Sequence, residues 1–138
     1  MREILFRGKR IDNGEWVEGF LVVVGKLYYI LTGKVDITKG VAFERFEVIP
    51  STVGQFTGLT DKDGVKIFEG DIVESKYTKK PYLVCFGEYT YTDEYGDEQD
   101  ACGWCNKDWD GYITALGSPY AWATVIGNIH DNPELLEV

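Results

Sequence analysis

The chain has 138 residues and carries 23 acidic against 14 basic side chains, a formal net charge of -9. This is the common size of a single domain with a real hydrophobic core, and the acidic balance disfavours binding to a phosphate backbone. Aromatic residues make up 14% of the chain and glycine occurs 16 times. Such a composition favours short strands joined by many turns, so the sequence predicts an all-β protein.

The first 50 residues predict an antiparallel meander. Asn13-Gly14 is a strong hairpin signal, Gly25-Lys26 predicts a second turn, and Pro50 ends the last strand. We place a domain boundary here, with an amino-terminal subdomain over 1–50 and a second domain over 51–138. The expected strands of the first part are 4–6, 16–24, 27–31 and 43–49.

The segment 53–73 predicts two tight hairpins in succession. Asp61-Lys62-Asp63-Gly64 supplies the chemistry of the first turn, and Glu69-Gly70-Asp71 that of the second. Beyond it, Asn132-Pro133 predicts one short helical turn near the end of the chain. The remaining expected strands are 73–77, 82–86, 112–116 and 121–129.

An acidic, aromatic insertion is expected over about 87–111. Between Glu88 and Asp110 there are eight acidic residues and one basic residue, Lys107. Tyr89 and Tyr91 alternate as on one face of a strand, which favours an extended edge hairpin, with an irregular loop as the alternative. Aromatic side chains anchor protein interfaces, and acidic neighbours steer toward a basic partner. The candidate partner-binding residues are Tyr89, Tyr91, Trp104 and Trp109.

Two other interpretations of the acidic run are a solvated face and a divalent cation site. The spacing of its carboxylates does not match a calcium-binding loop, which needs glycine at its sixth and glutamate at its twelfth position. Exposed strand edges also favour a homo-oligomer.

The cysteines suggest a second kind of site. Cys102-Gly103-Trp104-Cys105 has the spacing of a redox pair or of half a zinc site. A closed zinc site needs four ligands, and the available set is Cys85, Cys102, Cys105 and His130. The alternative is that the thiols have no chemical role, in which case no cofactor is expected. Since His130 is the only histidine and has no neighbouring nucleophile, we expect no enzymatic activity.

A third hypothesis is nucleic-acid binding through Lys76, Lys79 and Lys80, although the net charge makes nucleic acid a poor partner. The odd number of cysteines and the absence of an apolar leader predict reduced thiols in the cytoplasm. The longest apolar stretch, 20–24, is too short to cross a membrane.

Three stretches resemble the YopX family of phage and prophage proteins. They are Met1–Lys9, Val53–Val73 with its Gly-Gln-Phe-Thr-Gly-Leu opening and Phe-Glu-Gly-Asp-Ile-Val close, and Val125–Leu136. The resemblance implies an all-β protein with an SH3-like barrel or roll, and a family without an assigned activity from which catalytic residues could be transferred. We therefore expect a non-enzymatic binding module in the cytoplasm of a bacterial host, with a host or phage protein as its partner.

Overall fold

The computed structural model describes residues 3–33, 38 and 44–137. These residues form antiparallel strands joined by turns, so the predicted all-β fold is confirmed. The two sheets of the described chain do not close into a barrel, because β10 (Ile113–Ala115) and β11 (Ala123–Asn128) remain the outer strands of the second sheet. In this respect the structure departs from the SH3-like barrel that the family resemblance implied. No helix in the described part of the chain is long and apolar enough to cross a membrane.

The chain divides into two compact units, Met1–Phe56 (unit 1) and Thr57–Val138 (unit 2). The boundary lies inside strand β5 (Gly54–Thr60), which starts in one unit and ends in the other. The two domains predicted to meet at residue 50 stay a prediction. A domain is defined by its ability to fold independently, whereas the two units are defined by compactness alone.

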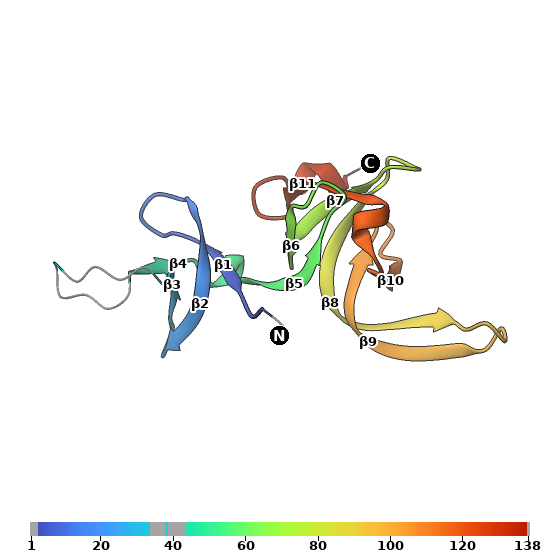
Figure 1. Cartoon of the computed structure of the whole chain (residues 1–138), viewed down its shortest axis with the longest axis horizontal. Helices are drawn as coiled ribbons and strands as arrows, with labels where there is room; N and C mark the ends of the chain where they lie inside the picture. The colour runs from blue at the N-terminus through green and yellow to red at the C-terminus, as the bar shows by residue number, and fades with distance from the viewer. Residues whose placement is uncertain (1–2, 34–37, 39–43, 138) are drawn as a thin grey trace. The chain divides into compact units, whose positions relative to one another are not determined.

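Unit 1 is a meander of four strands followed by the start of β5. Gly14 and Gly25 lie in its turns with φ of 72° and 61°, where the absence of a Cβ makes a positive φ inexpensive. Ile30 and Val48 are completely buried on one face of this sheet. The strands are β1 (Phe6–Lys9), β2 (Trp16–Val24), β3 (Leu27–Leu31) and β4 (Arg45–Val48), in the order β4-β3-β2-β1-β5 (Figure 1). Residue 43, the first of the predicted strand 43–49, lies outside the described residues.

Unit 2 contains a five-stranded antiparallel sheet in the order β10-β9-β8-β7-β11, and β6 (Lys66–Phe68) pairs with β5. Single 3-10 turns cover Pro119–Ala121 and Pro133–Leu136, the second as predicted from Asn132-Pro133. The sheet strands are β7 (Asp71–Ser75), β8 (Pro81–Thr92), β9 (Glu98–Lys107), β10 (Ile113–Ala115) and β11 (Ala123–Asn128).

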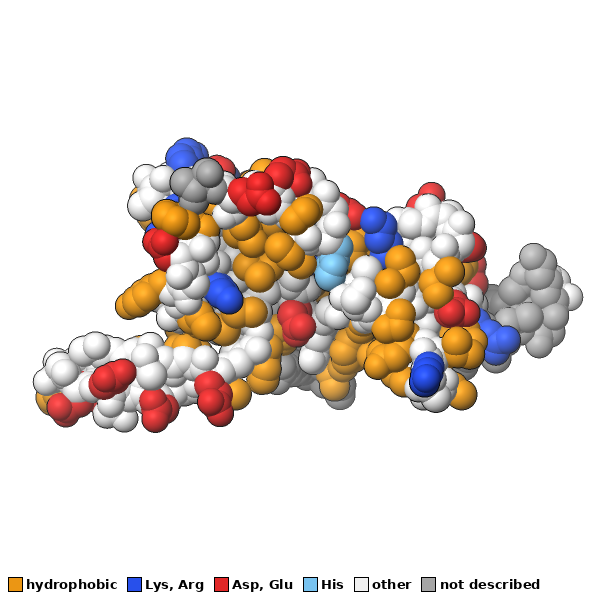
Figure 2. Space-filling model, turned by 180° about the vertical axis from the view of Figure 1, so that it is seen from behind, with side chains coloured by type: hydrophobic (Ala, Val, Ile, Leu, Met, Phe, Trp, Pro, Cys, Tyr) orange, Lys and Arg blue, Asp and Glu red, His pale blue; other side chains and the backbone are white. Residues whose placement is uncertain are grey.

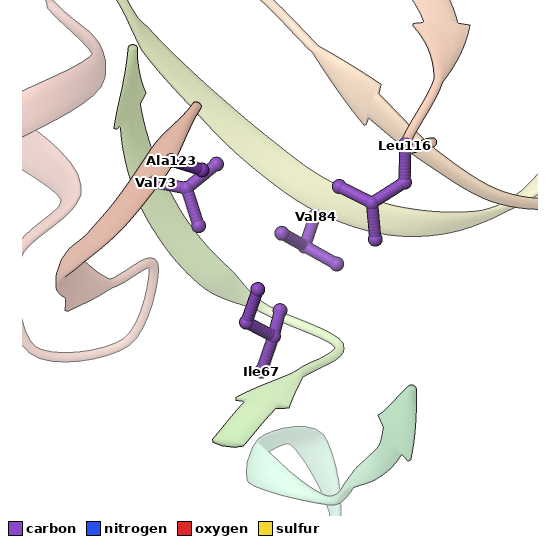
Figure 3. Close-up of a cluster of buried hydrophobic side chains, with 5 residues drawn as sticks. All are labelled: Ile67, Val73, Val84, Leu116 and Ala123. Atoms are coloured by element: carbon purple, nitrogen blue, oxygen red, sulfur yellow. The ribbon is translucent and has the colours of Figure 1, made fainter. Parts of the chain in front are cut away.

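The core of unit 2 draws one side chain from each of several segments. Ile67, Val73, Val84 and Ala123 lie on β6, β7, β8 and β11, and Leu116 directly follows β10. All five are at most 2% exposed (Figure 3). Fully burying a Val, Leu or Ile side chain contributes roughly 1.5–3 kcal/mol. Because these residues are far apart in sequence, the cluster connects the whole unit. The half-buried side chains that pack against it are Leu59, Tyr82, Trp104, Trp122 and Val125.

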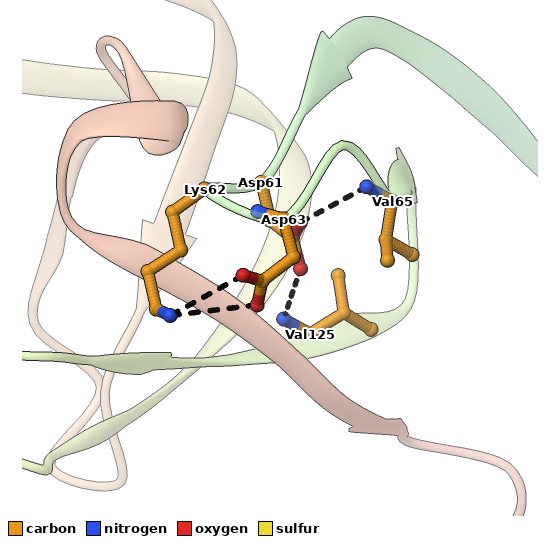
Figure 4. Close-up of polar contacts among 5 residues, drawn as sticks. All are labelled: Asp61, Lys62, Asp63, Val65 and Val125. Carbon is orange, nitrogen blue, oxygen red and sulfur yellow. Dashed lines mark hydrogen bonds and ion pairs between the residues drawn. The ribbon is translucent and has the colours of Figure 1, made fainter.

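The buried carboxylate of Asp61 fastens the β5–β6 turn to β11. Its Oδ1 accepts hydrogen bonds from the N–H groups of Asp63 at 2.9 Å and Val65 at 3.0 Å. Its Oδ2 accepts the N–H of Val125 at 2.9 Å (Figure 4). Asp61 is only 2% exposed, so these bonds replace the water that the carboxylate loses on folding. The nearby Lys62–Asp63 ion pair, at 3.4 Å, is exposed and contributes little.

The turn at Asp61 occurs three times in unit 2. In each copy an aspartate stands first and a glycine with φ of 82–85° stands fourth. The aspartate Oδ1 accepts the N–H groups of the third and fifth residues, at 2.9–3.0 Å. The same local hydrogen bonds therefore close the β5–β6, β8–β9 and β9–β10 hairpins. The three segments are 61–65, 93–97 and 108–112.

Candidate functional site

The β8–β9 hairpin has two halves with different surroundings. Gly87 and Gly103 lie directly opposite each other in its register. A glycine inside a strand permits a bend, and in Figure 1 both strands bend and then extend away from the rest of unit 2. We call 81–86 and 104–107 the base of the hairpin, and 88–102 the arm. The insertion expected over 87–111 is therefore largely an ordered hairpin and not an irregular loop.

The arm is uniformly acidic. It contains six acidic residues and no Lys, Arg or His. Because opposed residues of an antiparallel pair share a face, Glu88, Glu98 and Asp100 project from the same side of the arm. Figure 2 shows acidic side chains spaced along the arm at the lower left. Because the arm has no basic residue to offset these charges, it presents a concentrated negative surface to solvent.

The four aromatic side chains predicted to bind a partner do not form one surface. Tyr89 and Tyr91 lie on the arm, on the face opposite to Glu88, and Tyr91 is 48% exposed. Trp104 belongs to the base, where its ring meets Phe86 edge-on at 5.0 Å and packs on the core. Trp109 lies in the β9–β10 turn and is 50% exposed. The structure therefore brings together the two tyrosines, and it gives Trp104 a packing role in the fold.

An open hollow of about 520 Å³ lies along the arm. Two carboxylates, a tyrosine, a threonine and a thiol contribute to its walls, so it combines negative charge with apolar surface. A hollow of this kind suits an elongated side chain that ends in a positive group. Its lining residues are Glu88, Tyr89, Thr90, Asp100, Ala101 and Cys102.

The tip of the arm is held by Asp93. Its Oδ1 accepts the N–H groups of Tyr95 and Asp97, both at 2.9 Å, and its Oδ2 accepts Nε2 of Gln99 at 3.0 Å. The hydrogen bond from Asp97, together with those from Gln99 and Tyr95, lowers the pKa of Asp93 and outweighs the opposing effect of desolvation. Asp93 therefore keeps its negative charge at neutral pH while it shapes the turn.

The candidate zinc ligands are not gathered in one place. Cys102 and Cys105 are three residues apart on β9, so the strand directs them to opposite faces, and Cys102 is exposed whereas Cys105 is 1% exposed. Only Cys85 and Cys105 meet, with their Sγ atoms 3.1 Å apart. His130 lies in the turn after β11. Among the described residues no three His, Cys, Asp or Glu side chains are arranged to hold a metal ion, and zinc binding stays a prediction.

The three lysines proposed for nucleic acid lie in and near the β7–β8 turn. The Lys80 Nζ donates to Asp108 Oδ2 at 3.0 Å, and Lys76 Nζ lies 5.0 Å from the centre of the Tyr77 ring. The hydrogen bond that Lys80 donates to Asp108 raises the pKa of Lys80 against the effect of its desolvation. Asp108 therefore offsets one of the three lysine charges, and nucleic-acid binding at this turn stays a prediction.

Comparison with known proteins places the chain in a family. Residues 5–137 match the family described as YopX protein. The chain belongs to the YopX family. A solved structure of protein EF1440 from Enterococcus faecalis is similar to this YopX-family chain, with 22% sequence identity and a TM-score of 0.52. The match covers 99% of this chain and 100% of the other, and at that identity it concerns the fold alone. No curated protein matches the sequence.

Two features of this YopX-family chain were missed at the sequence level, although a signal was present. The turns at Asp93 and Asp108 repeat the aspartate-first, glycine-fourth spacing that was recognised only at Asp61. The separation of Cys102 from Cys105 follows from their odd spacing once 98–107 is known to be a strand. The contact of Cys85 with Cys105 carried no such local signal, because it depends on the register of the hairpin.

Proposed function

We propose that this protein is a non-enzymatic binding module whose arm docks onto a basic surface of a bacterial host or phage protein in the cytoplasm of the host. The observation that carries the proposal is the division of the β8–β9 hairpin at the Gly87–Gly103 pair. The base supplies core contacts through Val84 and Trp104, whereas no arm residue belongs to the core cluster or its surrounding shell in the described structure. The fold alone gives no reason for the arm's length.

The chemistry of the arm indicates the kind of partner. Six carboxylates without a compensating cation attract a positive surface over about a Debye length, roughly 8 Å at physiological ionic strength. Such charges increase the association rate more than the final affinity. The affinity then depends on anchors, and Tyr89 and Tyr91 supply rigid amphipathic side chains on one face of the arm.

The hollow along the arm indicates which side chains of a partner would fit it. Glu88 and Asp100 carry the charges of its wall, while Thr90 and Cys102 on the same face of the arm add a methyl group and a thiol. An arginine or lysine side chain matches both properties, because its stem is apolar and its end is positive. We therefore expect the partner to present Arg or Lys side chains from a protruding segment.

The experiment is capture of partners from a bacterial lysate at low and high salt, with quantitative mass spectrometry. One variant removes charge from the arm, E88Q together with D100N. A matched variant, E134Q together with E137Q, removes the same charge from exposed positions near the end of the chain. The proposal predicts that a protein with a basic surface is captured by the wild type and by the matched variant, is lost with the arm variant, and dissociates at high salt.

The contrary outcome is equal capture by all three proteins at both salt concentrations. In that case the arm carboxylates form a solvated face and the proposal is wrong. A further variant, Y89A together with Y91A, separates anchoring from steering. Its association rate should stay near that of the wild type, while its dissociation becomes faster.

A further inference from the structure

The two thiols at the base of the hairpin form a pair that the proposed function does not use. Cys85 on β8 and Cys105 on β9 are directly opposite each other in the register. Their Sγ atoms are 3.1 Å apart, and each Sγ also points at the other residue's carbonyl oxygen, at 3.5 and 3.7 Å. The third thiol, Cys102, is exposed on the other face of β9. The pairing is therefore selective, because one combination of the three thiols is in contact.

The register around this pair gives a Cα spacing of the kind that a disulfide needs. Directly opposed residues of an antiparallel pair have Cα atoms about 4.5 or 5.5 Å apart, and disulfides span Cα separations of about 4.4–6.8 Å. An S–S bond is about 2.05 Å long, so closure needs a movement of the sulfurs of roughly 1 Å, which side-chain rotation supplies. We propose that Cys85 and Cys105 are an oxidation site that closes to an intrachain disulfide at the base of the arm.

The glycine pair beside the cysteines provides access. Gly87 and Gly103 share a face with Cys85 and Cys105, one step toward the arm, and a Cβ placed on either glycine would meet nothing within 4 Å. The face next to the sulfurs is thus open, and Cys85 itself is only half-buried. A small oxidant can approach Cys85 from this side although Cys105 is buried.

The reaction is a thiol–disulfide exchange with a low-molecular-weight disulfide such as oxidised glutathione. The thiolate of one cysteine attacks the small disulfide, forms a mixed disulfide and releases one small thiolate. The second protein thiolate then attacks the protein sulfur of the mixed disulfide, which forms the Cys85–Cys105 bond and releases the second small thiolate. Two electrons pass from the cysteines to the reagent, and the two protein thiol protons end on the two small thiols at neutral pH.

The surroundings of Cys85 make this site slow at neutral pH. Desolvation raises the pKa of Cys85 to about 12, and the hydrogen bond with Cys105 acts in the same direction. Of the charged groups nearby, Lys107 on β9 lowers this pKa and Glu69 in the β6–β7 turn raises it. Only the thiolate reacts, so closure should become faster as the pH rises from neutral toward alkaline values.

The test is oxidation of the native protein with oxidised glutathione at neutral and alkaline pH, followed by alkylation and peptide mapping. The inference predicts a product lighter by the mass of two hydrogen atoms, a peptide linking Cys85 to Cys105, and a faster reaction at alkaline pH. C102S should give the same linked product, whereas C85S and C105S should not. Circular dichroism shows whether these variants fold, and the wild-type peptide map is decisive without them.

Two outcomes would overturn the inference. The first is a native protein in which Cys102 becomes glutathionylated while Cys85 and Cys105 keep free thiols throughout. The second is a linked peptide that contains Cys102. G103V tests the approach path, since its side chain would occupy the open face beside the sulfurs. Slower closure in this variant supports that path, and an unchanged rate contradicts it.

Discussion

The turn at Asp61 and the turn at Asp93 have the same local hydrogen bonds and opposite surroundings. In both, the aspartate Oδ1 accepts two N–H groups of its own turn. The remaining oxygen of Asp61 accepts the N–H of Val125 on β11, whereas that of Asp93 accepts the side chain of Gln99 in the arm. The turn at Asp61 therefore fastens the β5–β6 hairpin to β11. The turn at Asp93 has the same local hydrogen bonds but shapes only the tip of the arm. In the described structure the arm contributes no residue to the core cluster or to the side chains packed around it.

The largest expected effect comes from replacing the buried aspartate. D61N keeps the size of the side chain but turns one acceptor into an amide donor that faces backbone N–H groups. Losing a charged acceptor and leaving a buried N–H unsatisfied should lower the free energy of unfolding by about 3 kcal/mol. Urea denaturation measures this. D93N is the matched control with the same turn chemistry. Its effect should be far smaller, because Asp93 is only half-buried and its Oδ2 is bonded within the arm, whereas Asp61 is 2% exposed. Equal losses would contradict the difference between the two turns.

A smaller effect is expected from the apolar contacts along β8. V84A removes two methyl groups from a side chain that is 1% exposed, and should cost roughly 2 kcal/mol. T90A, on the same face of β8 but in the arm, should change the free energy of unfolding by less than about 0.5 kcal/mol. Thermal or urea unfolding of both variants provides the comparison. A large loss for T90A would show that the arm also supports the fold.

A still smaller effect concerns pH. Burial by itself would raise the pKa of Asp61, but the hydrogen bonds from Val125, Val65 and Asp63 lower it overall. A carboxyl group whose pKa is lower in the folded state stabilises the protein above its unfolded pKa, about 3.9, and loses this contribution as the pH falls through the folded value. The difference in stability between wild type and D61N should therefore be constant near neutrality.

Below about pH 4 that difference should shrink, by at most about 1.4 kcal/mol per pH unit. Denaturation curves of both proteins over an acidic pH series measure it. A difference that stays constant down to the lowest pH at which both proteins fold would mean that the ionised carboxylate is not what fastens the turn.

The sequence predicted the parts of the fold that depend on local chemistry. The hairpin turns at Asn13-Gly14 and at 61–64 are found, and so is the helical turn that begins at Pro133, because each is specified by neighbouring residues. The ends of strands were less accurate. Strand β8 continues to Thr92, beyond the predicted end at Phe86, because the cross-strand partners of β9 maintain it through a polar sequence.

The candidate site was predicted in composition and not in arrangement. The acidic and aromatic residues of the arm were identified, but which side chains share a face depends on the register set by the turn at 93–97. That register separates Trp104 from Tyr89 and Tyr91, and joins Cys85 to Cys105. Neither result could be read from spacing along one strand alone.

The most direct test of a separable binding arm is its removal. In the shortened protein, Asn-Gly replaces 88–102 and closes the hairpin at the Gly87–Gly103 pair with a two-residue turn. We expect the shortened protein to unfold cooperatively, with a free energy of unfolding within about 1 kcal/mol of that of the wild type. We also expect it to lose the partner that the intact chain captures. A shortened protein that is folded and still captures that partner would contradict the account.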